Sequence, residues 1–152
     1  MKHLATAVLL LLLAAACSSI ECPVKNTVAC YYQVNDTLKD TLTIFSHRKN
    51  GSDTILLNQS QNPTSFKLPL SYQNGVDTLL FTTKRLAVTD TVWLYKNDMP
   101  HFESVDCGVA YFHEIKDVKY TRKGIDSIII QKTFIDYDLT NPHLRIYFKS
   151  RD

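Results

Sequence analysis

Repeated alternation of apolar and polar residues, without a helical segment, is the feature that most limits the fold of this chain. β-Branched and aromatic residues dominate after residue 30, and turn residues interrupt them at short intervals. In Thr41–His47, for example, Leu42 and Ile44 alternate with threonines, which is the period of a strand with one buried face. The sequence therefore predicts an all-β fold in which two sheets share one core.

Nine segments have this strand pattern. They are Thr41–His47, Asp53–Asn58, Phe66–Tyr72, Val76–Thr83, Thr89–Lys96, Val109–Ile115, Val118–Arg122, Ile125–Phe134 and His143–Phe148. Asn50-Gly51 and Asn74-Gly75 predict hairpin turns, because both residue types tolerate positive φ, and Lys123-Gly124 predicts another tight turn. Pro69 lacks an N–H and places its strand at a sheet edge or bulge. We expect a single antiparallel β-sandwich of about eight to nine strands.

The first residues predict where the chain is located. Lys2 precedes the apolar run Leu4–Ala16, which has the length of a signal-peptide core and is too short to cross a bilayer of roughly 30 Å. The ending Leu13-Ala14-Ala15-Ala16-Cys17 resembles a bacterial lipobox, which predicts acylation of Cys17. The three alanines also fit ordinary signal cleavage, so plain secretion is the alternative. The predicted organisation is a signal peptide (1–16), a lipid-anchored tether (17–29) and a β-sandwich domain (30–152).

Composition limits the classes of partner. The formal net charge is only +2 and no basic stripe is visible, which argues against nucleic acid as a partner. The chain has four glycines and no glycine-rich phosphate loop, so no cofactor is predicted. No second apolar run is long enough to cross a membrane. We therefore expect membrane attachment only through an N-terminal lipid.

The cysteine count connects lipidation with disulfide formation. Ordinary cleavage would keep all four cysteines and allow two disulfides in an oxidising compartment. Acylation of Cys17 would instead leave Cys22, Cys30 and Cys107, so that one of the three is unpaired. We favour a bridge from Cys107 to either Cys22 or Cys30, which would close a long loop. A local Cys22–Cys30 bridge is the alternative.

A short triplet of Asp, a hydroxyl residue and an apolar residue recurs six times. Its hydroxyl residues are Thr37, Thr41, Thr54, Thr78, Thr91 and Ser127. Such triplets also arise without any modification, because Asp binds nearby backbone in a turn and Thr suits the strand that follows. The pattern resembles the O-glycosylation motif of Bacteroidota envelope proteins, which makes these six residues candidate glycosylation sites.

One segment concentrates side chains that could perform chemistry. It contains His101, Glu103, Asp106 and Cys107, and His113 follows closely. These residues could contribute to a metal site, or a histidine could activate Cys107 as a nucleophile. Their spacing matches no zinc motif, and a structural disulfide is the preferred role of Cys107. We therefore predict no catalytic or metal-binding residue, and an enzyme active site or metal site around His101–His113 is the third alternative.

Aromatic residues raise the alternative of glycan binding. Trp93 and Tyr95 lie two residues apart and would share one face of a strand. Stacked sugars need an exposed platform of this kind, although aromatic residues at alternate positions more often form cross-strand pairs. An accessory glycan-binding protein is therefore the second functional hypothesis.

Taken together, the chain resembles a family of small Bacteroidota lipoproteins of unknown function. The resemblance lies in Cys17 and Cys22, Leu68-Pro69-Leu70, Asp90–Tyr95, Phe102–Gly108 and Leu144–Phe148. It implies an all-β domain in the cell envelope, most consistent with attachment to the outer membrane, and it supplies no catalytic residues. We expect a non-enzymatic interaction or structural module with envelope proteins as partners.

Overall fold

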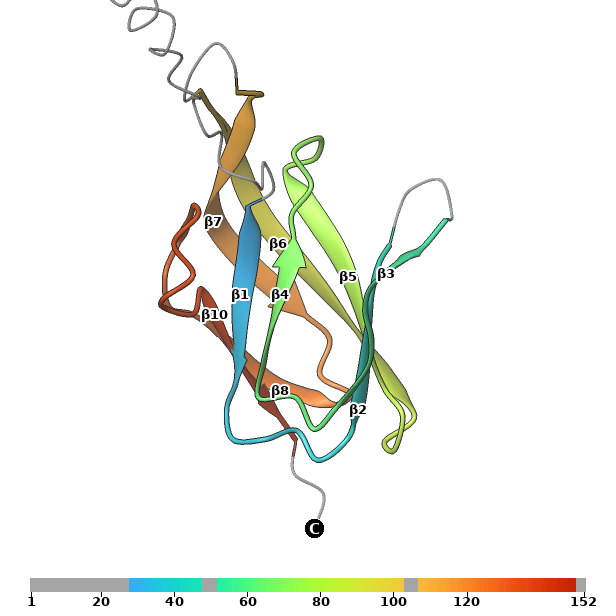
Figure 1. Cartoon of the computed structure of the whole chain (residues 1–152). Coiled ribbons are helices and arrows are strands. Elements are labelled where there is room, and N and C mark those ends of the chain that lie inside the picture. The colour runs from blue at the N-terminus through green and yellow to red at the C-terminus, as the bar shows by residue number, and fades with distance from the viewer. Residues whose placement is uncertain (1–27, 48–51, 103–106, 150–152) are drawn as a thin grey trace, which may run out of the picture.

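The computed structural model describes residues 28–47, 52–102 and 107–149, which form ten strands in two facing sheets (Figure 1). The strands are β1 (Ala29–Val34), β2 (Thr41–Ser46), β3 (Thr54–Gln61), β4 (Ser65–Pro69), β5 (Val76–Thr83), β6 (Val88–His101), β7 (Ala110–Tyr120), β8 (Ile125–Ile130), β9 (Phe134–Ile135) and β10 (Leu144–Phe148). The described part of the chain contains no helix, so the predicted all-β sandwich is confirmed.

The two sheets differ in size and in strand direction. The smaller sheet has the order β4-β1-β10-β8, and the larger has the order β3-β2-β5-β6-β7-β9. All neighbours pair antiparallel except β1 and β10, which are parallel with Tyr32 opposite Leu144. Because β1 and β10 start at the same end of the sandwich, we call this the N-terminal end. The opposite end, where β10 finishes at Phe148, is the distal end.

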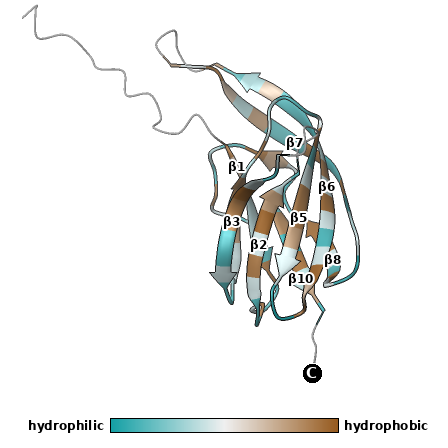
Figure 2. Cartoon of the chain, turned by 90° about the vertical axis from the view of Figure 1, so that its right-hand side faces the viewer, coloured by the Kyte–Doolittle hydropathy of each residue, from teal (hydrophilic) through white to brown (hydrophobic). Residues whose placement is uncertain are grey.

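The core lies between the sheets and follows the alternation of the strands. On β1, Cys30, Tyr32 and Val34 are buried while the residues between them are half-exposed. The ring of Tyr32 stacks on Phe66 of β4, with centroids 5.1 Å apart, and both rings contact Phe81 of β5. Hydrophobic and hydrophilic residues accordingly alternate along the strands of the larger sheet (Figure 2). These three aromatic rings join the two sheets.

Two buried carboxylates fasten turns at the distal end. Asp40 accepts hydrogen bonds from the backbone N–H groups of Arg85 (2.7 Å) and Leu86 (3.1 Å) in the β5–β6 turn. Asp90 accepts four, from the Thr121 hydroxyl and the N–H groups of Lys123, Gly124 and Ile125, at 2.6–2.9 Å.

These contacts explain why Gly124 fits its position. A Cβ there would lie 2.9 Å from the Val88 side chain and 3.3 Å from the Asp90 carboxylate. The aspartates of two of the six triplets therefore hold turns that are distant in sequence. Asp40 also accepts a bond from the adjacent Thr41 N–H at 2.6 Å, which is the bond to nearby backbone that the sequence predicts.

The sequence-based prediction of strands is wrong in four places. It does not predict β1, and it ends β6 at Lys96 whereas the strand continues to His101. It also divides β7 into two strands, and its single strand Ile125–Phe134 is β8 and β9 in the structure. Beyond Lys96, β6 continues as a two-stranded extension with β7, paired from Lys96–Ile115 to His101–Ala110. The sequence does not predict this extension because it contains polar and turn-forming residues such as Asp98 and Pro100.

The predicted Asn74-Gly75 hairpin is also wrong. Phe66 and its neighbours in β4 pair with β1, whereas β5 pairs with β2 and β6 in the other sheet. The 70–75 loop therefore carries the chain between sheets, as the Lys123-Gly124 turn does for β7 and β8. The predicted pairing of β2 with β3 is confirmed, although Asn50-Gly51 lies outside the described residues. Pro69 ends an edge strand, as predicted.

Candidate functional site

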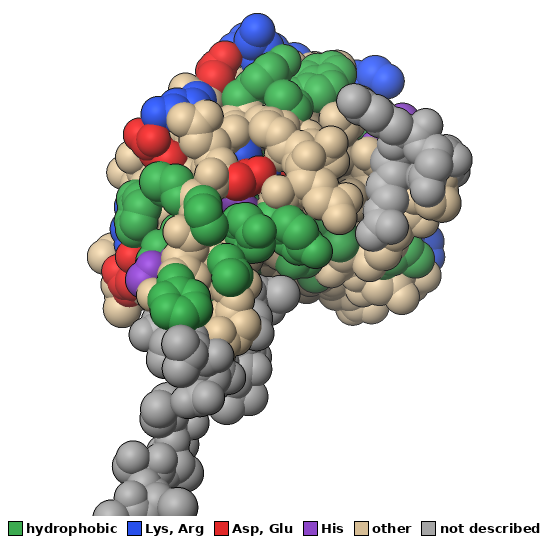
Figure 3. Space-filling view, turned by 90° about the horizontal axis from the view of Figure 1, so that it is seen from above, with side chains coloured by type: hydrophobic (Ala, Val, Ile, Leu, Met, Phe, Trp, Pro, Cys, Tyr) green, Lys and Arg blue, Asp and Glu red, His purple; other side chains and the backbone are tan. Residues whose placement is uncertain are grey.

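The N-terminal end of the sandwich is open, in contrast to the distal end. The described residues there form a cleft of about 960 Å³ between the 69–79 segment and the end of β2. Seen from this end, acidic and basic side chains occupy a recess surrounded by hydrophobic ones (Figure 3). The polar lining of the cleft comes from Ser46, His47, Ser71, Gln73, Asn74 and Asp77.

A buried lysine holds one wall of the cleft in place. The Lys96 ammonium donates to the backbone carbonyls of Ser71 and Asn74, the latter at 2.9 Å. It also donates to the Asp98 carboxylate at 2.5 Å, and Asp77 lies 3.9 Å away. The Lys96 side chain is fully buried, so its charge depends on these oxygens for compensation. Lys96 therefore fixes the 70–75 loop to β6.

His113 completes this charged cluster. Its Nδ1 lies 2.6 Å from the Asp98 carboxylate, so Nδ1 donates and Asp98 accepts hydrogen bonds from both His113 and Lys96. Burial lowers the pKa of His113, although the hydrogen bond to Asp98 opposes that shift. Burial has the opposite effect on the Asp77 carboxyl: it raises the pKa, and the nearby charge of Lys96 opposes that rise. The cluster thus combines a fully buried lysine with an imidazole whose charged form burial disfavours.

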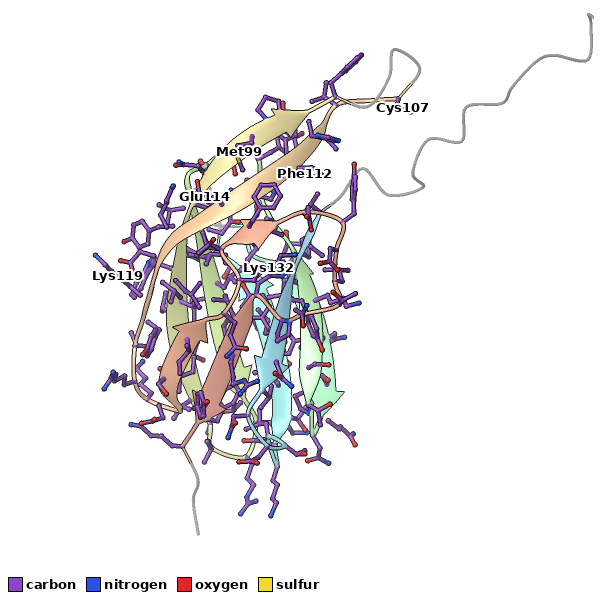
Figure 4. All side chains as sticks on the ribbon, turned by 90° about the vertical axis from the view of Figure 1, so that its left-hand side faces the viewer. Met99, Cys107, Phe112, Glu114, Lys119 and Lys132 are labelled. Carbon is purple, nitrogen blue, oxygen red and sulfur yellow. The ribbon has the colours of Figure 1, made fainter. Side chains whose placement is uncertain are left out.

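Aromatic rings cover both faces of the extended β6–β7 hairpin. On one face, Tyr111 stacks on Tyr72 of the cleft wall, with centroids 4.7 Å apart. On the other, Phe112 stacks on His101 at 4.2 Å and meets Phe134 and Tyr137 edge-on. The hairpin projects beyond the rest of the sheets, with Cys107 at its tip and Phe112 below it (Figure 4).

The histidines of the predicted reactive segment do not converge. His101 is opposite Ala110 in the register and His113 is opposite Asp98, so the two imidazoles lie on opposite faces of the hairpin. Glu103 and Asp106 lie outside the described residues. Among the described residues, no group of three or more His, Cys, Asp or Glu side chains could hold a metal ion.

The cysteines have different environments. Cys107 is disulfide-bonded, and Cys30 is a buried free thiol on β1. Cys30 was a candidate disulfide partner from the sequence, and that prediction is wrong because its side chain points into the core between the sheets. Burial raises the pKa of the Cys30 thiol far above its usual value, which leaves it protonated and unreactive. Cys17 and Cys22 lie outside the described residues.

The other predicted residues lie on the outside of the sandwich. Trp93 and Tyr95 are half-buried on the outer face of the larger sheet, where the Lys119 ammonium lies 5.2 Å from the Tyr95 ring centroid. The candidate hydroxyls all lie away from the core: Thr37 and Thr54 are exposed, and the half-buried ones are Thr41, Thr78, Thr91 and Ser127.

Sequence reasoning missed the Lys96 cluster. The available signal was the position of Lys96 in an alternating strand, two residues after Leu94, where a buried side chain is expected. A lysine at a core position requires oxygen partners, and Asp98 two residues later would lie on the same face. The loop carbonyls that complete the site could not be identified, because the predicted hairpin placed that loop differently.

Comparison with known proteins gives a family for this chain and no activity. No curated protein and no solved structure matches the chain. The described residues also contain no helix long and apolar enough to cross a membrane. Residues 41–148, which include β2 to β10, match the family of unknown function DUF6452. The chain belongs to this DUF6452 family.

Proposed function

We propose that this chain is a lipid-anchored, non-enzymatic module of the bacterial cell envelope that binds another envelope protein through its N-terminal end. The observation that carries this proposal is the open cleft, bordered by the exposed side chains of Tyr72 and Val76. Exposed tyrosine and apolar side chains are enriched in protein interfaces, and the polar groups beside them can supply hydrogen bonds to a partner.

The internal bonds of the charged cluster support a non-enzymatic role. Lys96, Asp98 and His113 are groups that could act as acids or bases, but their bonds hold the loop and the hairpin together. A catalytic group must reach substrate, and the Lys96 and His113 side chains are 0 and 2% exposed. Their positions indicate a structural role below the cleft.

The cysteines support acylation of Cys17. An acylated Cys17 requires that one of the other three cysteines be unpaired, and Cys30 is a free thiol. Because Cys107 is disulfide-bonded, Cys22 is then the partner that remains for it. We include a Cys22–Cys107 disulfide in the proposal. It would join the N-terminal tether to the tip of the hairpin.

Site-specific photocrosslinking in cells tests the binding surface. A benzophenone amino acid at Gln73, which lines the cleft, should form a discrete crosslinked product with an envelope protein. The matched control carries the same group at Arg85, an exposed residue in the distal β5–β6 turn. Equal products from both positions, or a product only from Arg85, would contradict the proposal.

Glycan binding is the second candidate, and the same cleft favours it. Hydroxyl, amide and carboxylate groups line the cleft, and the exposed Tyr72 ring stands at its rim. Titration with envelope oligosaccharides should then shift the NMR signals of Gln73 and Asn74, and leave those of the 84–87 turn unchanged. The absence of shifts at saturating oligosaccharide would exclude this candidate.

O-glycosylation remains part of the proposal for the triplet hydroxyls. Thr37 and Thr54 are the two exposed ones, which makes them the most accessible to a transferase. Glycopeptide mass spectrometry of the protein from its native cells should find hexose-containing peptides at these residues. Unmodified peptides covering all six hydroxyls would contradict this part.

A further inference from the structure

We infer that the cleft binds a cationic side chain, the guanidinium group of an arginine on the partner protein, at the Asp77 carboxylate. This inference rests on the proposed binding of an envelope protein through the cleft, and it names the chemistry that such a partner brings. It follows from the charges that line the cleft and from those directly beneath it.

Two carboxylates and one ammonium group lie together beneath the cleft. Asp77 is on the inward side of β5, two residues before the buried Leu79, and it lines the cleft. The Lys96 ammonium lies 3.9 Å from the Asp77 carboxylate and 2.5 Å from that of Asp98. The histidine of the cluster, His113, donates to Asp98, and burial disfavours its charged form. The described cluster is therefore one positive charge short of neutrality.

Asp77 is the carboxylate that lacks a close cation. The Lys96 ammonium is closer to Asp98, and two backbone carbonyls take its other hydrogen bonds. Asp77 Oδ2 accepts a hydrogen bond from the Ser71 N–H at 3.1 Å, and Oδ1 accepts none within the described part of the chain. Burial raises the pKa of this carboxyl, and the charge of Asp98 adds to that rise. A cation that enters the cleft would supply the missing charge.

The described lining of the cleft offers little to an anionic partner. The Lys96 side chain is fully buried, and its hydrogen bonds all stay within the protein. His47 is the only basic side chain of this lining, and its Nδ1 already lies 2.9 Å from the Asp53 carboxylate. The other lining side chains are apolar or carry hydroxyl or amide groups. Charge complementarity therefore favours a cationic partner over an anionic one.

The rim of the cleft favours arginine over lysine. Tyr72 is 56% exposed there, and its stacking on Tyr111, with centroids 4.7 Å apart, holds the ring in place. A guanidinium group can stack on an aromatic ring and donate two parallel hydrogen bonds to a carboxylate, which a lysine ammonium cannot do. Figure 3 shows acidic side chains in a recess that hydrophobic side chains surround. We expect one arginine to contact both the Tyr72 ring and Asp77.

Photocrosslinking in cells tests the role of Asp77. Asp77→Asn, which removes the charge and keeps the shape of the side chain, is added to the protein that carries benzophenone at Gln73. The yield of crosslinked product should fall about tenfold or more, as expected for the loss of a charge-assisted hydrogen bond. Asp77→Glu keeps the charge and should keep the product. Asp126→Asn is the matched control, because it removes an exposed carboxylate at the distal end.

A titration of the purified protein tests the ligand class without any substitution. The probe is the peptide acetyl-Gly-Arg-Gly amide, and the control peptide carries citrulline, which has the shape of arginine but no charge. The arginine peptide should shift the NMR signals of the Asp77 carboxyl and the Tyr72 ring. The citrulline peptide should need about tenfold or more higher concentration for the same shifts.

The outcomes separate this inference from the proposed function. Equal yields of Gln73 product with and without Asp77→Asn, or equal shifts with the two peptides, would overturn the cationic ligand and leave the binding of an envelope protein standing. The absence of a Gln73 product from the protein with Asp77 intact would overturn the proposed function and this inference with it.

Discussion

The two ends of the sandwich use buried charge differently. At the distal end, Asp90 and Asp40 accept hydrogen bonds from turn backbone, and each turn is fixed by one carboxylate. At the N-terminal end, a lysine, an aspartate and a histidine share their bonds below an open cleft. The distal end is therefore built to close the sandwich, whereas the N-terminal end supports a surface that remains accessible. The following predictions test that difference.

The largest effect is expected at Asp90. Asp90→Ala removes the acceptor for four donors, two of which are buried N–H groups, and should lower the free energy of unfolding by roughly 3–5 kcal/mol. Asp126→Ala is the matched control, because this aspartate is exposed and bonds only to the Ser127 hydroxyl. Urea unfolding measures both variants. Similar losses for both would contradict a special role of the distal carboxylate.

Lys96→Met should lower the free energy of unfolding somewhat less than Asp90→Ala does, and it should also loosen the 70–75 loop. Removing the ammonium leaves Asp98 and Asp77 with less compensation, which should cost about 3 kcal/mol. The 70–75 loop should also exchange its amide hydrogens faster, because it loses two bonds to Lys96. Lys116→Met is the control, since its pair with Glu114 is exposed and should contribute less than about 1 kcal/mol. Unchanged loop exchange in Lys96→Met would show that the lysine does not hold the cleft wall.

The two ends should respond to acid in different pH ranges. Burial lowers the pKa of His113 and of His143, which accepts a bond from the Tyr31 N–H at 2.9 Å. The unfolded chain then binds more protons than the folded chain below about pH 6.5, so stability should fall as the pH decreases from there, by up to ~1.4 kcal/mol per pH unit for each histidine.

Asp90 should lose its contribution in a lower pH range than the histidines. Burial opposes its ionisation, but the bonds from Thr121, Lys123, Gly124 and Ile125 lower its pKa below the usual value. Its contribution is present above about pH 3.8 and is lost only as the pH falls further. Unfolding measured from pH 7 to 3 should therefore show two ranges of loss. A His113→Gln/His143→Gln variant should remove the upper range, and a variant that keeps it would contradict the assignment.

The smallest effect is expected at Cys30. Cys30→Ala leaves a small cavity between β1 and the larger sheet and should cost on the order of 1 kcal/mol. In the native protein the thiol should not react with a thiol reagent, and one thiol per chain should become reactive on unfolding without reductant. Three or more reactive thiols would contradict the disulfide at Cys107, and two would contradict acylation of Cys17.

The sequence predicts the fold class because alternation alone is sufficient for it. Leu42 and Ile44 are both buried as their spacing indicates, and Pro69 ends an edge strand. Sheet membership could not be predicted in the same way. An Asn-Gly pair favours a turn, but the pairing of β4 with β1 depends on contacts between distant segments, such as Tyr32 with Phe66.

The candidate site shows the same limit. His101 and His113 are close in sequence, but the register places them on opposite faces of the hairpin. Lys96 and Ser71 are distant in sequence, and they meet because the 70–75 loop passes between the sheets. A residue type can suggest chemistry, while the partner that decides its role comes from the tertiary structure.

Metabolic labelling with a palmitate analogue tests the central claim, attachment through Cys17, most directly. The wild-type protein and Cys30→Ser should both carry the label and fractionate with membranes, because Cys30 is buried in the core. Cys17→Ser should lose the label and leave the membrane fraction. A Cys17→Ser protein that still carries the label and stays with membranes would contradict the lipid anchor on which the proposed function rests.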